Sequence, residues 1–431
     1  MNRNAPHQSN PSMLAENVEN PPLSQAAHRA SFFRQSGWLM IANIGGGVLM
    51  WAVHLLNKAI PASEYGNFGF FLAIVMLLPA IPLQMILTQQ TAKALAIGRQ
   101  GELAGVVRAF AGGAFLLWAC GAVIVLLFQQ HIVEHWHMSN PAGLWITLPV
   151  VLVSLWLPMI WGVLQGQQNF LWLGWSMLAN AVGRFSVAAV AVLLLHAYAA
   201  GMMTGVLIGV IASALIGVWQ TRGVWFGQGE PFDARGLLRQ AVPLLLAFLG
   251  FQILFTVDTI FVKSYFPENV AGFYVSAGTL SRALMWLVLP LASVMFPRLV
   301  HSAARSEKSN LMGVVLMGTG LLAVTGALGL WLVGPWVVRL IYKPEFVQVA
   351  SSILPWYAFA MVPLSLANVL LNNLLARPDS KWGLALSVFL LSVAYMIGLT
   401  EFHTSLVTVL KTVGAFNLLL LGLCGWFSLK H

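Results

Sequence analysis

Apolar runs of about 20 residues recur along almost the whole of this chain, and each is long enough to cross a bilayer core as a helix. Only 8% of its 431 residues are charged, whereas soluble proteins carry roughly 25%. Backbone polar groups in lipid must be satisfied within the chain itself. The sequence therefore predicts an all-α polytopic membrane protein.

Twelve spans are predicted, separated by short loops that carry turn-forming residues such as Asn140-Pro141. Their expected ranges are 36–58, 67–88, 108–129, 143–165, 172–195, 201–221, 240–263, 271–297, 311–333, 350–375, 382–400 and 405–428. Residues 1–30 are polar and rich in Asn and Pro, and they lack the apolar segment of a signal peptide. We expect them to form a disordered cytoplasmic tail.

The basic residues predict the orientation of the chain. Of 22 Lys and Arg residues, fifteen fall in segments that the span map places in the cytoplasm and four in segments on the outer side. The positive-inside rule therefore predicts that both termini are cytoplasmic. The basic residues are scattered over many loops, so the net charge of +9 does not indicate a nucleic-acid partner.

The sequence repeats itself at a separation of 205 residues. Residues 34–58 (RQSGWLMIANIGGGVLMWAVHLLNK) align with 239–263 (RQAVPLLLAFLGFQILFTVDTIFVK), with seven identities in 25 positions. One residue out of register, 64–68 aligns with 270–274. The first and seventh spans would then both run outward. The sequence thus predicts two six-helix halves, 31–222 and 239–431, joined by a cytoplasmic linker over 223–238. A pseudo-two-fold axis along the membrane normal would relate them, as in transporters that rock about a central site.

Arginines lie near the middle of two predicted spans, Arg184 in the fifth and Arg282 in the eighth. A guanidinium at this depth costs about 2.5 kcal/mol or more, so it is expected to face protein or a water-filled cavity. Asp258 is the one acidic residue clearly inside a predicted span, so no matching set of acids is expected to neutralise the arginines. A cationic cavity favours an anionic ligand such as phosphate. The alternative is a structural pair of Asp258 with Arg282 or Lys263.

Polar side chains at helical spacing surround these charges and complete the predicted cavity site. The further site residues are Lys411, Asn43, His54, Asn180, Gln252, Thr256 and Thr259. Two alternatives stay open: such polar stripes also hold membrane helices together, and Lys411 could reach the interface instead. The glycine run 45–47 and Gly250 are expected to permit close packing or bending.

The sequence contains no Walker A motif, zinc-type His/Cys array or paired carboxylates. The stretch HIVEHWH (131–137) is interpreted as an aromatic-rich loop at the membrane interface rather than a metal site. We therefore expect a transporter rather than an enzyme, with no cofactor.

Several stretches carry a family resemblance along nearly the full chain. They are ASEYGNFGFFLAI (62–74), GVLQGQQNFLWLGWSMLANAVGRF (162–185), VDTIFVKSYFPENVAGFYVSAGTLSRAL (257–284), MFPRL (295–299) and LIYKPEFVQVA (340–350). The chain resembles the O-antigen and capsule repeat-unit flippases of the multidrug/oligosaccharidyl-lipid/polysaccharide exporter superfamily. In that family, Arg184 and Arg282 would occupy positions of cationic cavity residues.

The resemblance implies a flippase of the bacterial cytoplasmic (inner) membrane. Its substrate would be an undecaprenyl-diphosphate-linked oligosaccharide, moved from the inner to the outer leaflet by alternating access for surface polysaccharide or lipopolysaccharide synthesis. Membrane lipid, a polysaccharide polymerase and glycosyltransferases would be partners. Such transport is often coupled to an ion, H+ or Na+, although acids suited to bind a cation are nearly missing here.

Three other functions are weighed against this one. A multidrug exporter of the superfamily would need acidic residues for cationic drugs and protons, and Asp258 alone disfavours it. A lipid II flippase would typically carry fourteen helices, whereas twelve are predicted. A non-transporting membrane subunit of a polysaccharide-synthase complex is the alternative from another class.

Overall fold

The structure is a computed structural model that describes residues 21–136, 138, 140–285, 311–376 and 381–430. Within these residues it consists of helices and their connections, with no strand. Eleven helices are long and apolar enough to cross a membrane, and a helical segment over 268–285 lies in the eighth predicted span. Every predicted span thus coincides with a helix, which confirms the predicted all-α polytopic fold. Residues 286–297 of the eighth span lie outside the described residues, as does the motif 295–299.

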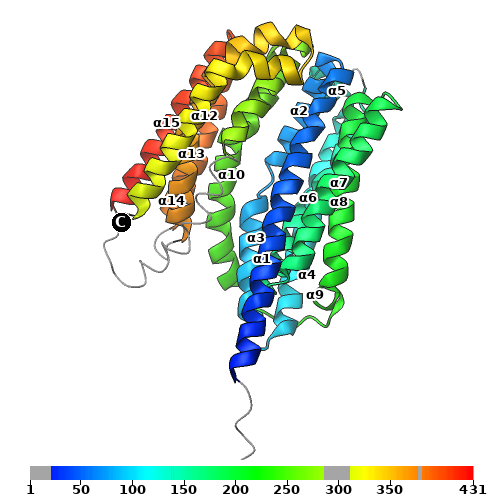
Figure 1. Cartoon of the computed structure of the whole chain (residues 1–431), viewed down its shortest axis with the longest axis vertical. Helices are drawn as coiled ribbons and strands as arrows, with labels where there is room; N and C mark the ends of the chain where they lie inside the picture. Colours follow the sequence, from blue (N-terminus) through cyan, green and yellow to red (C-terminus); the bar gives the residue numbers. More distant parts are fainter. Residues whose placement is uncertain (1–20, 137, 139, 286–310, 377–380, 431) are drawn as a thin grey trace, which may run out of the picture.

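The helices divide into an N-terminal and a C-terminal lobe (Figure 1). The N-terminal lobe contains α1 (Pro21–Ala52), η2 (Val53–Ala59), α2 (Ala62–Met76), α3 (Ala80–Ala96), α4 (Gln100–Leu127), α5 (Gln129–His135), α6 (Ala142–Gly166), α7 (Phe170–Leu193), α8 (Tyr198–Gln220) and α9 (Arg222–Phe226). The C-terminal lobe contains α10 (Ala234–Tyr265), the segment 268–285, α12 (Leu311–Ile341), α13 (Pro344–Ala376), α14 (Lys381–Glu401) and α15 (Leu406–Lys430).

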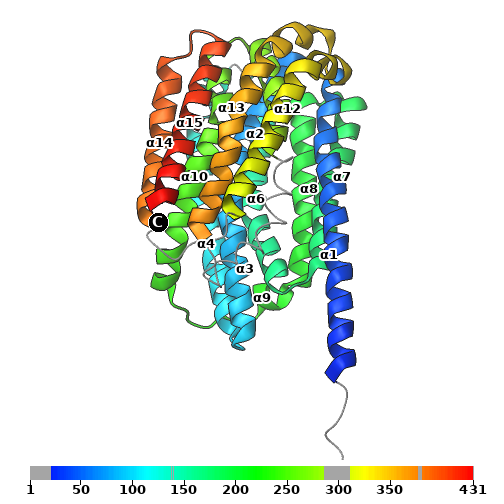
Figure 2. The same cartoon turned by 60° about the vertical axis from the view of Figure 1, so that its left-hand side comes forward.

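Packing within each lobe follows the repeat. In the N-terminal lobe α1 packs on α7, α7 on α8, α8 on α6 and α6 on α3, whereas in the C-terminal lobe α10 packs on α14 and α13 on both α12 and α15. α10 also lies along α2 and α3, so it joins the lobes. Figure 2 shows α1 at the edge of the molecule beside α7 and α8. The predicted two-lobe organisation is confirmed.

The chain has two distinct ends along the helix axes. The N-terminus of α1 and the C-terminus point toward the lower end in Figures 1 and 2, which we call the termini end. η2, α5 and the connection between α12 and α13 lie at the opposite end, which we call the far end. The positive-inside bias predicts that the termini end is cytoplasmic.

The second span is broken, although the sequence analysis treated 67–88 as one helix. α2 ends at Met76 and α3 begins at Ala80, with Pro79 between them. Proline has no N–H and its ring clashes with the carbonyl four residues earlier, so it favours a kink or a break in a helix. The break frees the carbonyl oxygen of Met76, which accepts a hydrogen bond from Gln252 Nε2 of α10 at 2.6 Å. The break is thus a point of contact between the lobes.

Two further boundaries differ from the predictions. Residues 21–30, expected in a disordered tail, belong to α1, which begins at a proline; residues 1–20 lie outside the described residues. Proline is well tolerated at a first helical position, where its missing N–H is not needed. α10 begins at Ala234, inside the expected linker, because Asp233 accepts a hydrogen bond from the N–H of Gly236 and caps the helix.

Candidate functional site

Arg184 lies near the middle of α7 and is only 9% exposed. Among the described residues it forms no ion pair, and its buried Nε has no hydrogen-bond partner. His54 of η2 lies close enough to interact with it electrostatically. A buried charge without a partner costs several kcal/mol, so such a group is normally paired with an ion or well hydrated. The Arg184 guanidinium therefore has unused capacity to bind an anion.

The position of Arg184 is set by unusually close packing of α7 on α8. A Cβ atom at Gly209 would overlap the carbonyl oxygen of Asn180, and one at Gly205 would lie 2.5 Å from the carbonyl oxygen of Arg184. Backbones in a membrane approach this closely only through small residues. Asn180 itself is buried next to this contact, one turn before Arg184. The glycines of α8 thus hold the backbone from which the Arg184 side chain extends.

Arg282, on the segment 268–285, is paired with Asp258 of α10. Its Nη2 lies 2.8 Å from Asp258 Oδ1 and donates to Thr259 Oγ1 at 2.9 Å, while its Nε donates to the Phe255 carbonyl oxygen at 3.0 Å. The Arg282 side chain is 12% exposed and that of Asp258 1%. The structure thus shows the pair of Asp258 with Arg282 that the sequence analysis left open as the alternative, and the expectation of two unbalanced arginines is wrong for Arg282. The two charges meet because α10 and the segment 268–285, which follow each other in the chain, pack side by side.

Tyrosine hydroxyls complete the surroundings of Asp258. Tyr274 and Tyr357 both donate hydrogen bonds to Asp258 Oδ2, the former at 2.7 Å. The Arg282 guanidinium also lies over the rings of Phe255 and Tyr357, at 5.6 and 5.4 Å from their centroids. Sequence reasoning missed both tyrosines. The available signal was that a tyrosine in an apolar helix needs a partner for its hydroxyl.

The predicted polar face of α10 has no single role. Thr259 contacts Arg282, while Gln252 binds the helix break of the second span. Thr256 and Lys263 are buried, and neither the Thr256 hydroxyl nor the Lys263 ammonium has a hydrogen-bond partner among the described residues. The spacing that placed these residues on one face does not bring them to one site.

Three other predicted site residues lie elsewhere. His54 is buried in η2, and its Nδ1 lies 2.8 Å from the hydroxyl of Tyr65. Asn43 is exposed on α1. Lys411 is exposed on α15, with its ammonium 5.3 Å from the ring centroid of Trp356. The structure thus groups Arg184, Asn180 and His54 in the N-terminal lobe, and Arg282, Asp258 and Thr259 in the C-terminal lobe.

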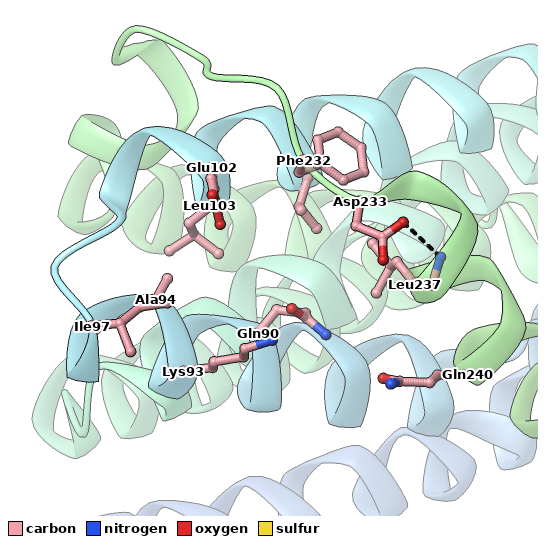
Figure 3. Close-up of a pocket in the computed structure, with 12 residues that line it drawn as sticks. Gln90, Lys93, Ala94, Ile97, Glu102, Leu103, Phe232, Asp233, Leu237 and Gln240 are labelled. Atoms are coloured by element: carbon pink, nitrogen blue, oxygen red, sulfur yellow. Dashed lines mark hydrogen bonds between the residues drawn. The ribbon is translucent and has the colours of Figure 1, made fainter.

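A pocket of about 140 Å³ lies at the termini end, between α3, α4 and the start of α10 (Figure 3). Gln90 and Lys93 of α3, Glu102 of α4 and Asp233 before α10 are among its polar lining residues. None of the ten predicted site residues lines this pocket. Its charges are mixed, so it offers no selective site for an anion, and it is separate from both arginines.

Known structures share this fold across nearly the whole chain. An inward-facing multidrug resistance MATE family transporter of the MOP superfamily has a TM-score of 0.71 at 12% identity, covering 89% of this chain and 94% of the other. The lipid II flippase MurJ, in an inward closed conformation, has a TM-score of 0.66 at 14% identity, covering 91% and 87%. A Vibrio cholerae MATE transporter has a TM-score of 0.60 at 14% identity, covering 93% and 97%. Identities this low establish the fold alone.

The fold is therefore that of a multi-pass membrane protein, and solved MATE and MurJ structures share it. Residues 101–420 match the family described as lipid II flippase MurJ. The chain belongs to that family. No curated protein matches the sequence.

The family match corrects the sequence analysis in one respect. The predicted count of twelve helices disfavoured a lipid II flippase, yet it is this family that the chain matches. Helix count is a weak criterion here, because the fold is shared with the solved MurJ structure over 91% of this chain and 87% of that one. The expected resemblance to O-antigen and capsule repeat-unit flippases in particular is not shown: the family matched is that of lipid II flippases, and a MATE transporter of the MOP superfamily shares the fold.

Proposed function

We propose that this protein is a flippase for a lipid-linked, diphosphate-bearing saccharide. In this proposal the substrate is an undecaprenyl-diphosphate-linked oligosaccharide of surface polysaccharide synthesis. The protein moves it from the inner to the outer leaflet of the bacterial cytoplasmic membrane by alternating access, without covalent chemistry. Both termini are cytoplasmic in this proposal, and a polymerase and glycosyltransferases act on either side of the transport step.

The observation that carries the proposal is the unpaired Arg184. A guanidinium that lacks an acidic partner in the described structure binds phosphate bidentately and keeps its charge at every physiological pH. A diphosphate supplies two negative charges, and its lipid tail can stay in the bilayer while the headgroup crosses. Membership of a flippase family supports a lipid-linked substrate.

Arg282 would contribute differently in this proposal. Its charge is already compensated by Asp258, so it offers a ligand less net attraction than Arg184. Its side chain is nevertheless 12% exposed. We assign it a secondary contact with the substrate and a main role in holding Asp258.

Lipid II is the second candidate substrate, and the family match favours it directly. Lipid II and a polysaccharide repeat unit share the polyprenyl diphosphate, so the argument from Arg184 applies to both. The two substrates differ in their sugar and peptide portions. None of the residues described above is assigned a contact with those portions. Export of cationic drugs has less support, because Asp258 is already bonded to a guanidinium and two tyrosine hydroxyls.

The experiment measures translocation in proteoliposomes with three substrates: lipid II, a lipid-linked repeat unit and a cationic dye. Arg184→Ala should lower translocation of the diphosphate lipids roughly ten- to hundredfold, the value of one charged hydrogen-bonding contact of about 1.5–3 kcal/mol. Arg184→Lys should restore part of it, since the charge remains but the planar fork is lost.

Arg222→Ala is the matched control, because this exposed guanidinium lies over the Trp219 ring at the end of α8. It should leave translocation unchanged. Full translocation of both diphosphate lipids by a folded Arg184→Ala variant would overturn the anion-site proposal. Translocation of the dye alone would contradict the flippase proposal and favour a drug exporter. If none of the three substrates moved, the result would favour a non-transporting membrane subunit of a polysaccharide-synthase complex.

A further inference from the structure

The two lobes meet at the far end through glycines that occupy equivalent positions in the internal repeat. Gly66 of α2 and Gly272 of the segment 268–285 align when the chain is compared with itself. A Cβ atom at Gly66 would lie 2.9 Å from the backbone nitrogen of Gly272, and one at Gly272 would overlap the carbonyl oxygen of Ala62. Equivalent residues of two repeats can touch only close to the axis that relates them. The helices therefore cross backbone to backbone near the pseudo-two-fold axis.

The contact continues one turn along α2. A Cβ atom at Gly69 would overlap the Val275 side chain, so the absence of a side chain at Gly69 makes room for Val275 of the other lobe. Any side chain larger than hydrogen at these glycines would push the lobes apart. The two glycines of the sequence YGNFG in α2 are thus fitted to the opposite lobe.

Hydroxyl groups beside the glycine crossing also join the lobes. The Tyr65 hydroxyl bonds to His54 Nδ1 within the N-terminal lobe and lies 3.4 Å from the Tyr342 hydroxyl of the C-terminal lobe. The Tyr342 hydroxyl in turn donates to the carbonyl oxygen of Ser276 at 3.4 Å. The rings of Tyr65 and Tyr342 are both buried and pack edge to face. Because these hydroxyl groups are buried, parting the lobes would leave them without partners unless water replaces them.

An aromatic residue closes the other side of the contact. Phe346 of α13 is fully buried and packs against Tyr65 of the N-terminal lobe and Phe273 of its own lobe, with ring centroids 6.2 and 5.0 Å apart. Burial of an aromatic side chain contributes a few kcal/mol. The far end is thus closed by apolar packing and a hydroxyl chain around one glycine crossing.

We propose that Gly66, Gly272, Tyr65 and Tyr342 form a latch that keeps the far end shut and must part for a substrate to leave there. The inference rests on the proposed function, because it assigns the latch to the exit step of transport. It adds a link to the anion site, since His54 bonds to Tyr65 and lies within electrostatic range of Arg184. The glycines set how closely the lobes approach, and the hydroxyl chain sets how firmly they hold.

Distances between spin labels at the far end test the latch without any substrate. Gln130→Cys in α5 and Glu401→Cys in α14 place labels on exposed positions of the two lobes. Cys120, which is exposed, is replaced by serine, and the buried Cys424 stays. In nanodiscs, Gly272→Ala should shift the distance distribution toward longer values, because the added methyl group cannot fit while the far end is shut.

Gly209→Ala is the matched control for damage to the fold. Its methyl group would overlap a carbonyl oxygen as that of Gly272→Ala does, but inside the N-terminal lobe. It should lower thermal stability and leave the distance between the lobes unchanged. An unchanged distance in a folded Gly272→Ala protein, or equal shifts in both variants, would overturn the latch.

Tyr65→Phe and Tyr342→Phe remove only the hydroxyl chain and keep the packing, so these variants are expected to fold. Each should add a population with longer distances, smaller than that of Gly272→Ala. Tyr395→Phe is the control, because its buried hydroxyl has no partner among the described residues and lies within one lobe. A distance response without any lipid translocation by the wild-type protein would reject the proposed function alone. Normal translocation without a distance response would reject the latch alone.

Discussion

Two arginines that look alike in the sequence differ in the structure in whether an acidic side chain compensates their charge. Arg282 is neutralised by an acid 24 residues earlier, while Arg184 has no acidic partner in the described part of the chain. Both are largely withdrawn from solvent. Only Arg184 therefore requires a further anion or water to be stable, and only Arg282 requires a particular residue of the protein.

The pair of Arg282 and Asp258 predicts non-additive losses of stability. Removing one member of a buried pair costs about 3–5 kcal/mol, because the remaining charge is left uncompensated. We expect Arg282→Ala and Asp258→Asn each to lower the free energy of unfolding by this order, and the double variant to lose clearly less than the sum. Denaturant unfolding in detergent micelles measures all four proteins. Simple additivity would show that the two side chains act independently.

Replacing Lys263 is expected to raise stability, whereas replacing Arg282 or Asp258 lowers it. Its side chain is 1% exposed and its ammonium has no hydrogen-bond partner among the described residues, although Glu64 and Glu268 lie within electrostatic range. Lys263→Met keeps the volume and removes a desolvated charge, so thermal stability should rise. The control is Lys58→Met at the equivalent repeat position, which is exposed and should change little. A fall in melting temperature for Lys263→Met would show that the electrostatic attraction outweighs desolvation.

At the scale of elements, the largest difference from the predicted helices is the break of the second span into α2 and α3. Pro79 ends one helix and the carbonyl oxygen freed at Met76 is satisfied from the other lobe by Gln252. A broken helix at membrane depth is tolerated because a neighbouring helix supplies the missing hydrogen bond. The break is thus tied to the contact between the lobes.

This contact predicts the effect of Gln252→Leu. Loss of the amide leaves the Met76 carbonyl oxygen without its partner, at a cost of about 1–3 kcal/mol. The melting temperature should fall by a few degrees, measured by fluorescence of the purified protein. Gln84→Leu is the control, since its amide bonds to the side chain of Gln165 and its loss leaves no backbone carbonyl oxygen of the break without a partner. Equal effects of both substitutions would contradict a special role for the break.

At the scale of the whole molecule, hydropathy and the repeat were sufficient to predict the spans and their division into two lobes. These properties are local in the chain, because the thickness of the bilayer sets the length of each helix. The sequence also showed that Gly66 and Gly272 are equivalent positions of the internal repeat. Its consequence was not, since alignment shows that two residues are equivalent and not that they touch.

The sequence by itself thus determined the membrane class, the helices and the candidate charges of this protein. The tertiary structure alone decided that Asp258 holds Arg282, that two tyrosines hold Asp258, and that Arg184 stays without an acid in the described residues. The physical reason is that electrostatic and hydrogen-bond energies depend on distances of a few ångströms between side chains. Those distances arise only when helices far apart in the chain pack together.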